Sequence, residues 1–343
     1  MRDLDLDLGM DPSIDEITPS TPGAPGHREG AALFVWDDAE RFGVPRIGVE
    51  AVGATWDTAR GFQVTIQQPD GRMLAVSSSA APHGVHDASG RPRVFGAGPV
   101  RLECVEPFRH WRVELDGELV DTSVEAVLRS GPPTGAGAAA FAAAGGRAVS
   151  VRLLVDARMV APPWVLGTRD PDGAFPPVGE HRFEQLFVAT GTLSIEDGDE
   201  RAFSGGGLRI HRKGANRGAG GDFYGHCWQT GSLPSGRAYG FMHYHPRPDG
   251  SVKYHEGWIR DGDRTVPAKV VDTPWMHDFT DQGEDVSFTL RSARGDVRIE
   301  AETFVSWFKP GRPGGFPTWQ AGITRCRWDG EPGHGMIERT PIS

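Results

Sequence analysis

The sequence predicts an all-β protein, and two observations carry that prediction. The chain of 343 residues contains about ten short runs in which apolar and polar residues alternate or apolar residues cluster, spaced roughly 8–15 residues apart. The dipeptide Asp-Gly recurs between these runs, and it favours the tight hairpin turns that require positive φ. Many short strands joined by such turns are typical of β-sandwiches and β-barrels.

Each strand is expected where one of these runs occurs. The clearest runs are GFQVTIQQ (61–68), RLECVEPFRHWRVEL (101–115), VSVRLLVDARMV (149–160), QLFVATGTLSI (185–195), RAYGFMHYH (237–245), VKYHEGWIR (252–260), VSFTLRS (286–292) and VRIEAETFVSWF (297–308). Residues 132–147, PPTGAGAAAFAAAGGR, depart from this pattern. We interpret their alanine run, flanked by glycines, as a loop with about one helical turn.

Two breaks in the pattern divide the chain. Residues 1–28 carry several acids followed by the run TPSTPGAPG, so we predict a disordered or loosely draped N-terminal arm. A second break, TRDPDGAFPPVGEH at 168–181, is rich in Pro, Gly and Asp. The sequence therefore predicts two β domains of similar size, at 29–175 and 176–343.

The charge of the chain argues against two classes of partner. The net charge is −10, and no run of Lys and Arg exceeds two residues. A groove that follows a nucleic-acid backbone needs clustered positive charge, as does adhesion to an anionic membrane. The N-terminus has no apolar core of a signal peptide, and no apolar run reaches 18 residues. We expect no nucleic-acid partner and no integral membrane segment.

The cysteines indicate a reducing compartment. Cys104, Cys227 and Cys326 are odd in number, far apart and free of any Cys-x-x-Cys pattern. Such a set gives neither a disulfide framework nor a zinc site, and it fits a cytoplasmic protein.

No motif for a bound cofactor is present. The chain has no GxGxxG followed by a helix, no GxxxxGK[ST], no GxSxG and no HExxH. The triplet Gly205, Gly206 and Gly207 lies between predicted strands, where glycine density makes a phosphate cradle a weak interpretation. We therefore expect no cofactor.

Polar aromatic residues gather between residues 211 and 277. This window holds six of the twelve histidines and all four tyrosines of the chain. Such side chains join an apolar body to a polar tip, as a ligand pocket requires. The period of two places three sets on shared strand faces. The sets are Tyr224, His226 and Trp228; Tyr239, Phe241, His243 and His245; and Tyr254, Glu256 and Trp258.

If these strands are neighbours, their faces could line one cavity with an acid/base site. We predict His226 and Glu256 as a proton-transfer pair, because an imidazole beside a carboxylate in an apolar setting can relay a proton. His243 and Tyr254 would orient the substrate. The expected substrate-binding residues are Tyr224, Trp228, Tyr239, Phe241, Tyr254, Trp258 and Trp275. The alternative is a solvated sheet face with hydrogen-bonded histidines.

A metal site is the weaker interpretation of the same residues. His243 and His245 share one strand face, which is a spacing used by metal sites in β-barrels. A third ligand is not specified by the sequence, although His226 and Glu256 are candidates. We therefore predict no metal.

The segment EHRFEQLFVATGTLSIEDGDERAFSGGGLRIHRKGANR, residues 180–217, resembles a known family. It is similar to the lipocalin-like proteins grouped with hydroxyneurosporene synthase (a carotenoid hydratase), the AttH-type proteins and the fungal Diels–Alderase-like cyclases. The matching positions are Phe183, Glu184, Gln185, Gly191, Gly205, Gly207, Arg209, His211, Gly214 and Arg217, with Trp228 on a tryptophan-rich strand. FRHWRVELDG, at 108–117, and the ending HGMIER also resemble strands of these proteins.

The resemblance implies two lipocalin-like β domains packed side by side, with an apolar cavity in or between them. Members that are enzymes perform hydration, cyclisation or isomerisation without redox cofactors. His211 is the motif position carried over as a catalytic candidate. Ile210 and Lys213 stand where the motif has aspartate and tryptophan, which argues against hydration by the carotenoid hydratase mechanism. With these groups lost, His211, Arg209 and Arg217 could instead form a buried polar knot that ties strands together.

These observations lead to a functional hypothesis and two alternatives. The first is a cofactor-independent enzyme of hydratase, cyclase or isomerase type that acts on an apolar terpenoid, polyketide or lipid-like molecule. The second is a non-catalytic carrier of lipocalin type for a hydrophobic small molecule. The third is an interaction scaffold, which would leave the clustered tyrosines and histidines unexplained. A homodimer is left open as the state of assembly.

Overall fold

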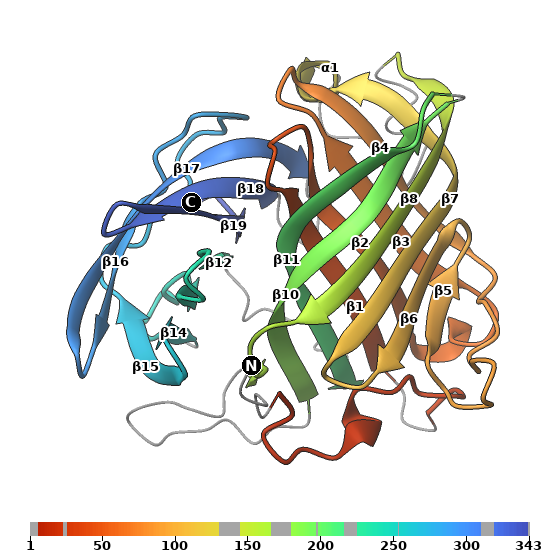
Figure 1. Ribbon diagram of the computed structural model, residues 1–343, viewed down its shortest axis with the longest axis horizontal. Helices are drawn as coiled ribbons and strands as arrows, with labels where there is room; N and C mark the ends of the chain where they lie inside the picture. The colour runs from red at the N-terminus through yellow and green to blue at the C-terminus, as the bar shows by residue number, and fades with distance from the viewer. Residues whose placement is uncertain are drawn as a thin grey trace.

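The computed structural model describes residues 6–22, 26–129, 145–165, 180–196, 198–215, 225–252, 254–309 and 319–341. These residues form two β units that pack side by side (Figure 1). We call them the N-terminal barrel, which holds strands β1 to β11, and the C-terminal barrel, which holds β12 to β19. The predicted all-β, lipocalin-like architecture is confirmed.

The N-terminal barrel closes by a pairing between distant strands. Its strands are β1 (His27–Asp37), β2 (Gly43–Val52), β3 (Arg60–Gln67), β4 (Arg72–Ala80), β5 (Val94–Ala97), β6 (Val100–Glu106), β7 (His110–Ser123), β8 (Arg147–Met159), β9 (Trp164–Val165), β10 (Glu180–Ile195) and β11 (Arg201–Ala215). The order is β4-β3-β2-β1-β11-β10-β8-β7, and β4 also pairs with β7. β6 and β5 continue the sheet beyond β7, and β9 pairs with β10.

The C-terminal barrel closes in sequence order. Its strands are β12 (His226–Ser232), β13 (Ala238–Tyr244), β14 (His255–Asp261), β15 (Arg264–Val270), β16 (Phe288–Ser292), β17 (Gly295–Lys309), β18 (Trp319–Trp328) and β19 (Glu331–Arg339). Neighbours are antiparallel, and β19 returns to pair with β12. Short helical segments are η1 (Pro12–Ile14), η2 (Gly53–Thr55) and α1 (Val124–Arg129).

The chain passes from the N-terminal barrel to the C-terminal barrel after β11, which is later than the predicted domain boundary at 175/176. β10 pairs with β8, and β11 pairs with β1, so residues 180–215 belong to the N-terminal barrel. The physical reason is that the Pro- and Gly-rich segment is followed by strands that return to the first sheet. The alanine-rich run at 132–147 lies mostly outside the described residues.

The middle of β1, residues 31–36, is continuously apolar because both of its faces are buried. Leu33 and Val35 point into the core of the N-terminal barrel, whereas Phe34 and Trp36 point toward the C-terminal barrel. A strand buried on both faces needs apolar residues at every position. β8 instead alternates, because its outer face meets solvent: Val151, Leu153 and Val155 are buried and their neighbours are not fully buried.

The buried apolar residues form separate clusters. One fills the N-terminal barrel, and another, which includes Tyr239, Phe241 and Phe288, fills the C-terminal barrel. A third cluster lies between the barrels and takes residues from both, among them Phe34, Leu208 and Trp228. The barrels therefore share an apolar interface.

The N-terminal segment 6–22, for which the sequence predicts a disordered or loosely draped arm, contacts the N-terminal barrel through buried side chains. Asp15 is fully buried, and its Oδ1 accepts a hydrogen bond of 2.5 Å from Nη1 of Arg209. Its Oδ2 accepts bonds from the backbone N–H of Phe108 at 2.7 Å and from Nε1 of Trp111 at 3.0 Å. An acidic segment becomes ordered here because a buried cation and buried donors require a partner.

Candidate functional site

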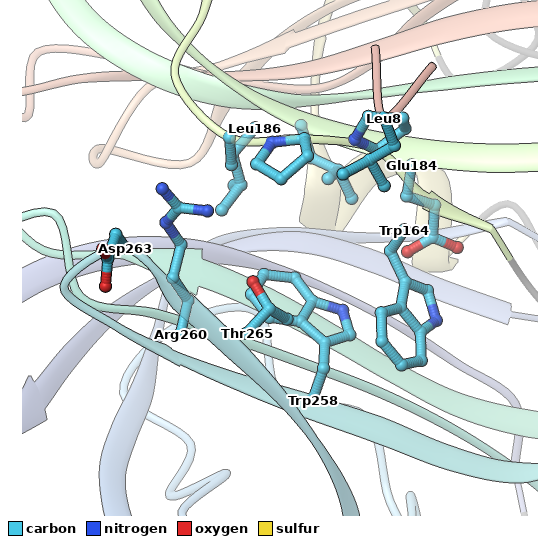
Figure 2. Close-up of a pocket in the computed structure, with 12 residues that line it drawn as sticks. Leu8, Trp164, Glu184, Leu186, Trp258, Arg260, Asp263 and Thr265 are labelled. Carbon is cyan, nitrogen blue, oxygen red and sulfur yellow. The ribbon is translucent and has the colours of Figure 1, made fainter. Parts of the chain in front are cut away.

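A cavity of about 150 Å³ lies between the two barrels (Figure 2). Its walls are mostly apolar, with charged residues at opposite ends. The lining residues are Leu8, Ala161, Pro162, Pro163, Trp164, Glu184, Leu186, Leu208, Trp258, Arg260, Asp263 and Thr265. An apolar cavity with a few fixed polar groups is the usual form of a small-molecule site.

Each barrel contributes an indole to this cavity. Trp164 comes from β9 and Trp258 from β14, and their ring centroids are 6.1 Å apart with the planes tilted by 31°. Leu186 and Leu208 complete the wall on the N-terminal barrel. Leu8 reaches the cavity from the ordered N-terminal segment (Figure 2).

Glu184 is the buried acid of the cavity wall. Only 4% of its surface is exposed, and burial raises the pKa of its carboxyl. Arg182 and a hydrogen bond of 3.0 Å from Nε1 of Trp228 act in the opposite direction, while the charge of Glu256 adds to the rise. The net effect is a carboxyl whose pKa lies above that of an ordinary glutamate.

A second buried carboxyl, Glu338, has the opposite protonation preference. Its Oε1 lies 3.0 Å from Nε2 of His226, and Oε2 accepts a bond of 3.2 Å from Nη1 of Arg46. Burial alone would raise the pKa of Glu338, but His226 and Arg46 outweigh it and lower the pKa. Arg46 lies on β2, so this group also links the two barrels.

The structure places two of the three predicted faces together. The register aligns Trp228 with Met242 and Met242 with Glu256, so Trp228 and Glu256 share the face toward the N-terminal barrel. Trp258 lies on that face two residues further along β14. His226 shares it as well, but the carboxylate at its Nε2 is that of Glu338 and not the predicted Glu256.

Tyr239 and Phe241 lie on the other face of β13, so the prediction that all three faces line one cavity is wrong. Both side chains are buried in the core of the C-terminal barrel. Their rings lie 5.3 and 4.7 Å from that of Phe288. Neither residue lines the cavity between the barrels. The pairing of Trp228 with Met242 makes the even-numbered residues of β13 face the cavity side.

His243 and Trp275 form a separate cluster. The His243 ring stacks on His255 with centroids 3.9 Å apart, and Trp275 lies 4.9 Å away. Nδ1 of His243 is 2.7 Å from Oγ1 of Thr273. Burial, followed by the charges of His255 and His245, lowers the pKa of His243 to about 3. This ring is therefore neutral near pH 7, and it is not part of the cavity wall.

The remaining predicted residues are scattered. Tyr254 is buried and packs against Tyr244 with centroids 4.8 Å apart. Tyr224 lies outside the described residues. Among the described residues, no three His, Cys, Asp or Glu side chains are grouped to hold a metal ion.

His211 lies inside the N-terminal barrel and not at the cavity. It is fully buried, with Nδ1 3.1 Å from Oδ1 of Asp15 and Nε2 3.0 Å from Oε1 of Glu29. Arg209 bonds to Asp15 and to Oε1 of Gln185. For His211 and Arg209 this arrangement agrees with the structural alternative of a buried polar knot, whereas Arg217 lies outside the described residues.

A family model, "Domain of unknown function (DUF7064)", matches residues 12–341. The chain belongs to this family. The DUF7064 chain has no match among the curated proteins. Within the part of the chain that the structure describes, no helix has both the length and the apolar composition needed to cross a membrane.

Solved structures share the fold of the DUF7064 chain at low identity. The AttH-type protein NE1406 of Nitrosomonas europaea is 13% identical with a TM-score of 0.61, covering 95% of this chain and 100% of its own. CghA, in a structure with Sch210972, is 12% identical with a TM-score of 0.53 and 95% of each chain covered. Kievitone hydratase of Nectria haematococca is 10% identical with a TM-score of 0.48, covering 96% and 94%.

These structures confirm the predicted likeness of fold to the AttH-type proteins. At these identities the likeness establishes the fold, and the chemistry of the DUF7064 site has to be argued from its own residues.

Sequence reasoning did not select several residues of the site as functional, although it listed Glu184 among the positions that match the family motif. Glu184, Arg260 and Trp164 line the cavity, and Glu338 is the partner of His226. A signal for Glu184 was available, because an acid within the apolar strand FEQLFV requires a buried partner. Trp164 and Glu338 carry no comparable signal, since only their neighbours across the interface give them a role.

Proposed function

We propose that this DUF7064 protein is an enzyme that binds an apolar small molecule between its barrels and converts it by proton transfer. The reaction is a hydration, cyclisation or isomerisation of a terpenoid, polyketide or lipid-like molecule, without a redox cofactor. The observation that carries the proposal is Glu184, a buried carboxyl with a raised pKa on the wall of a cavity that two indoles line.

Glu184 is the proposed general acid. Because its pKa is raised, more of this carboxyl carries a proton at a given pH than of an ordinary glutamate, and the protonated form can protonate a carbon–carbon double bond. The new C–H bond leaves a carbocation on the substrate, which the π faces of Trp164 and Trp258 can stabilise. The resulting Glu184 carboxylate is held by Arg182 and by the indole N–H of Trp228.

The proton returns to Glu184 at the end of the cycle. In an isomerisation or cyclisation the cation loses a proton to the Glu184 carboxylate. In a hydration, water adds to the cation and the added water loses that proton. Every variant of the reaction thus balances with one carboxyl group acting first as acid and then as base.

Glu256 remains a proposed second acid/base group. It is 8% exposed and lies close enough to Glu184 for its charge to raise the Glu184 pKa. We propose that His226 and Glu338 form a hydrogen-bonded pair beside Trp228 and that this pair has an indirect, electrostatic role. The walls are proposed to be Trp258, as the sequence predicted, and Trp164.

The likeness of fold supports a small-molecule ligand. CghA shares this fold with a TM-score of 0.53, and its structure was determined with Sch210972. The cavity of the present chain fits roughly one six-membered ring, since a cavity of this volume accommodates benzene. A larger molecule would extend from its open side.

The first experiment is native mass spectrometry of the purified protein, followed by organic extraction of any bound molecule. We expect a stoichiometric apolar adduct, which would identify the chemical class and provide a substrate for turnover assays. An empty protein that also fails to bind a hydrophobic fluorescent probe would count against an apolar ligand.

The second experiment separates an enzyme from a carrier. Glu184→Gln keeps the size of the side chain but removes its proton, so turnover should fall by roughly 10²- to 10⁴-fold while ligand binding persists. The control is Glu331→Gln, which removes an acid that pairs with Arg237 on the outside of the C-terminal barrel. Conversion at the wild-type rate in Glu184→Gln would remove Glu184 from the mechanism. Binding without conversion in the wild type would favour the carrier.

A further inference from the structure

Arg260 is a buried cation that forms no hydrogen bond and no ion pair with the residues that the structure describes. Only 5% of its surface is exposed, and its guanidinium lines the cavity between the barrels. Arg182 and Arg46, which also lie between the barrels, are paired with Glu184 and Glu338. Buried charges are ordinarily paired, and Arg260 differs from Arg182 and Arg46 in this respect.

The surroundings of Arg260 favour the binding of an anion next to its guanidinium. Burial lowers the pKa of its guanidinium, and the opposing charge is that of Asp263, which is itself exposed. A cation that loses its hydration without gaining a partner is destabilising. An anionic ligand group would provide the missing hydrogen bonds.

The cavity separates this cation from the proposed acid. Figure 2 shows Arg260 and Asp263 at one end, Glu184 and Trp164 at the other, and the indole of Trp258 between them. The Arg260 guanidinium rises from β14 toward Leu186 (Figure 2). A ligand bound here would meet a positive charge at one end and an acid with aromatic walls at the other.

We propose that Arg260 binds a carboxylate of the ligand, so that the ligand is an apolar carboxylic acid. Its anionic end lies at Arg260 and its apolar part lies between Trp164 and Trp258. The planar guanidinium matches a carboxylate in geometry through two parallel N–H···O bonds. A phosphate dianion fits less well, because the other charged groups on the wall, Glu184 and Asp263, are acids. This inference rests on the proposed function only in using the same cavity.

The test compares a matched pair of ligands, 3-phenylpropanoate and its uncharged amide, 3-phenylpropanamide. Their dissociation constants are measured by titration calorimetry at low salt. In the wild type the carboxylate should bind at least about tenfold more tightly, because hydrogen bonds between charged groups are strong. In Arg260→Gln the preference for the carboxylate should disappear.

Two further variants test whether the effect is specific to the charge at Arg260. Arg264→Gln removes the same charge from an exposed position on the next strand, and it should keep the preference. Arg260→Met replaces the unpaired cation by an apolar side chain of similar length, so its thermal midpoint should exceed that of the wild type. It should also gain no stability from added 3-phenylpropanoate.

The outcomes separate this inference from the proposed function. Equal affinities for acid and amide in the wild type would overturn the role of Arg260 and leave an apolar site. A preference for the carboxylate that survives in Arg260→Gln would overturn it as well. No saturable binding of either compound up to about 10 mM would count against the cavity as a ligand site, and so against both.

Discussion

The indole Nε1 of Trp228, on β12, donates a hydrogen bond of 3.0 Å to Oε2 of Glu184, on β10. This bond crosses from the C-terminal to the N-terminal barrel and ends on the acid of the cavity wall. It also lowers the pKa of a carboxyl that burial raises. The packing of the two barrels therefore determines the acidity of Glu184.

Replacing Trp228 by Phe should raise the pKa of Glu184 further. The variant keeps an aromatic ring but removes the donor that favours the carboxylate. We expect the carboxyl to stay protonated to a higher pH than in the wild type, measured by carbon-13 NMR of labelled glutamate. The free energy of unfolding should fall by about 1–3 kcal/mol, because a buried acceptor loses its bond.

Trp56→Phe is the matched control for this variant. Trp56 is fully buried in the N-terminal barrel, and its Nε1 has no hydrogen-bond partner among the described residues. It should leave the titration of Glu184 unchanged. A Glu184 pKa that does not move in Trp228→Phe would show that this hydrogen bond does not tune the acid.

Asp15→Asn should destabilise the protein strongly, because Arg209 would keep a buried charge without its counter-ion. Loss of one partner of a buried pair costs about 3–5 kcal/mol. Burial alone would raise the pKa of Asp15, but Arg209 and His211 outweigh it and lower the pKa below its usual range. A lowered folded-state pKa adds stability at pH values above about 4, and this contribution is lost as the pH falls.

Urea denaturation of wild type and Asp15→Asn between pH 3 and pH 7 measures this effect. The difference in unfolding free energy should be full above pH 4 and should shrink in more acidic solution. Asp11→Asn is the control, since Asp11 caps η1 from an exposed position in the same segment. A gap between wild type and Asp15→Asn that stays constant with pH would mean that the carboxylate charge is not the cause.

His243 should remain neutral throughout the physiological range. Its pKa of about 3 lies below the ordinary value of 6.5, so the folded state binds fewer protons than the unfolded state between these values. Stability from this group is full above pH 6.5 and declines as the pH falls toward 3. NMR titration of the imidazole should show no protonation above about pH 4.

His243→Gln should remove that part of the acid-induced loss of stability. Thermal denaturation from pH 4 to pH 7 would give a flatter profile for the variant than for the wild type. A His243 ring that titrates near pH 6 would contradict the burial and stacking described for it.

Gly207→Ala should disrupt β11. A Cβ at this position would lie 2.2 Å from Cζ of Phe187 and 2.2 Å from the backbone oxygen of Phe34. Overpacking of this kind costs about 1–3 kcal/mol and occasionally more. Gly84→Ala is the control, because a Cβ there meets nothing within 4 Å. Equal midpoints in urea for both variants would contradict the close approach at β11.

The glycine triplet shows that tertiary contacts can explain a motif for which the sequence suggested another role. A phosphate cradle was a weak interpretation of Gly205, Gly206 and Gly207. In the structure these residues form the middle of β11, where Trp36 and Phe187 cover them too closely for a side chain. Their role is close packing. The local sequence does not predict which residues of neighbouring strands will contact them.

The candidate site was predictable in part. The alternation of β12 and β14 correctly placed His226 with Trp228 and Glu256 with Trp258 on shared faces. The same rule grouped Tyr239 with Phe241 but could not tell that this pair points into the other core. A period of two defines faces within one strand, whereas the register between strands decides which faces meet.

Local alternation and turn residues were sufficient to predict the all-β class, several of the strands and the residues that share a strand face. Only the tertiary structure decided that β10 and β11 return to the first sheet, that Asp15 orders the N-terminal segment, and that Glu184 meets Trp228. The physical reason is separation along the chain. Asp15 and Arg209 lie 194 residues apart, and a buried charge acquires its partner only when the barrels close and pack.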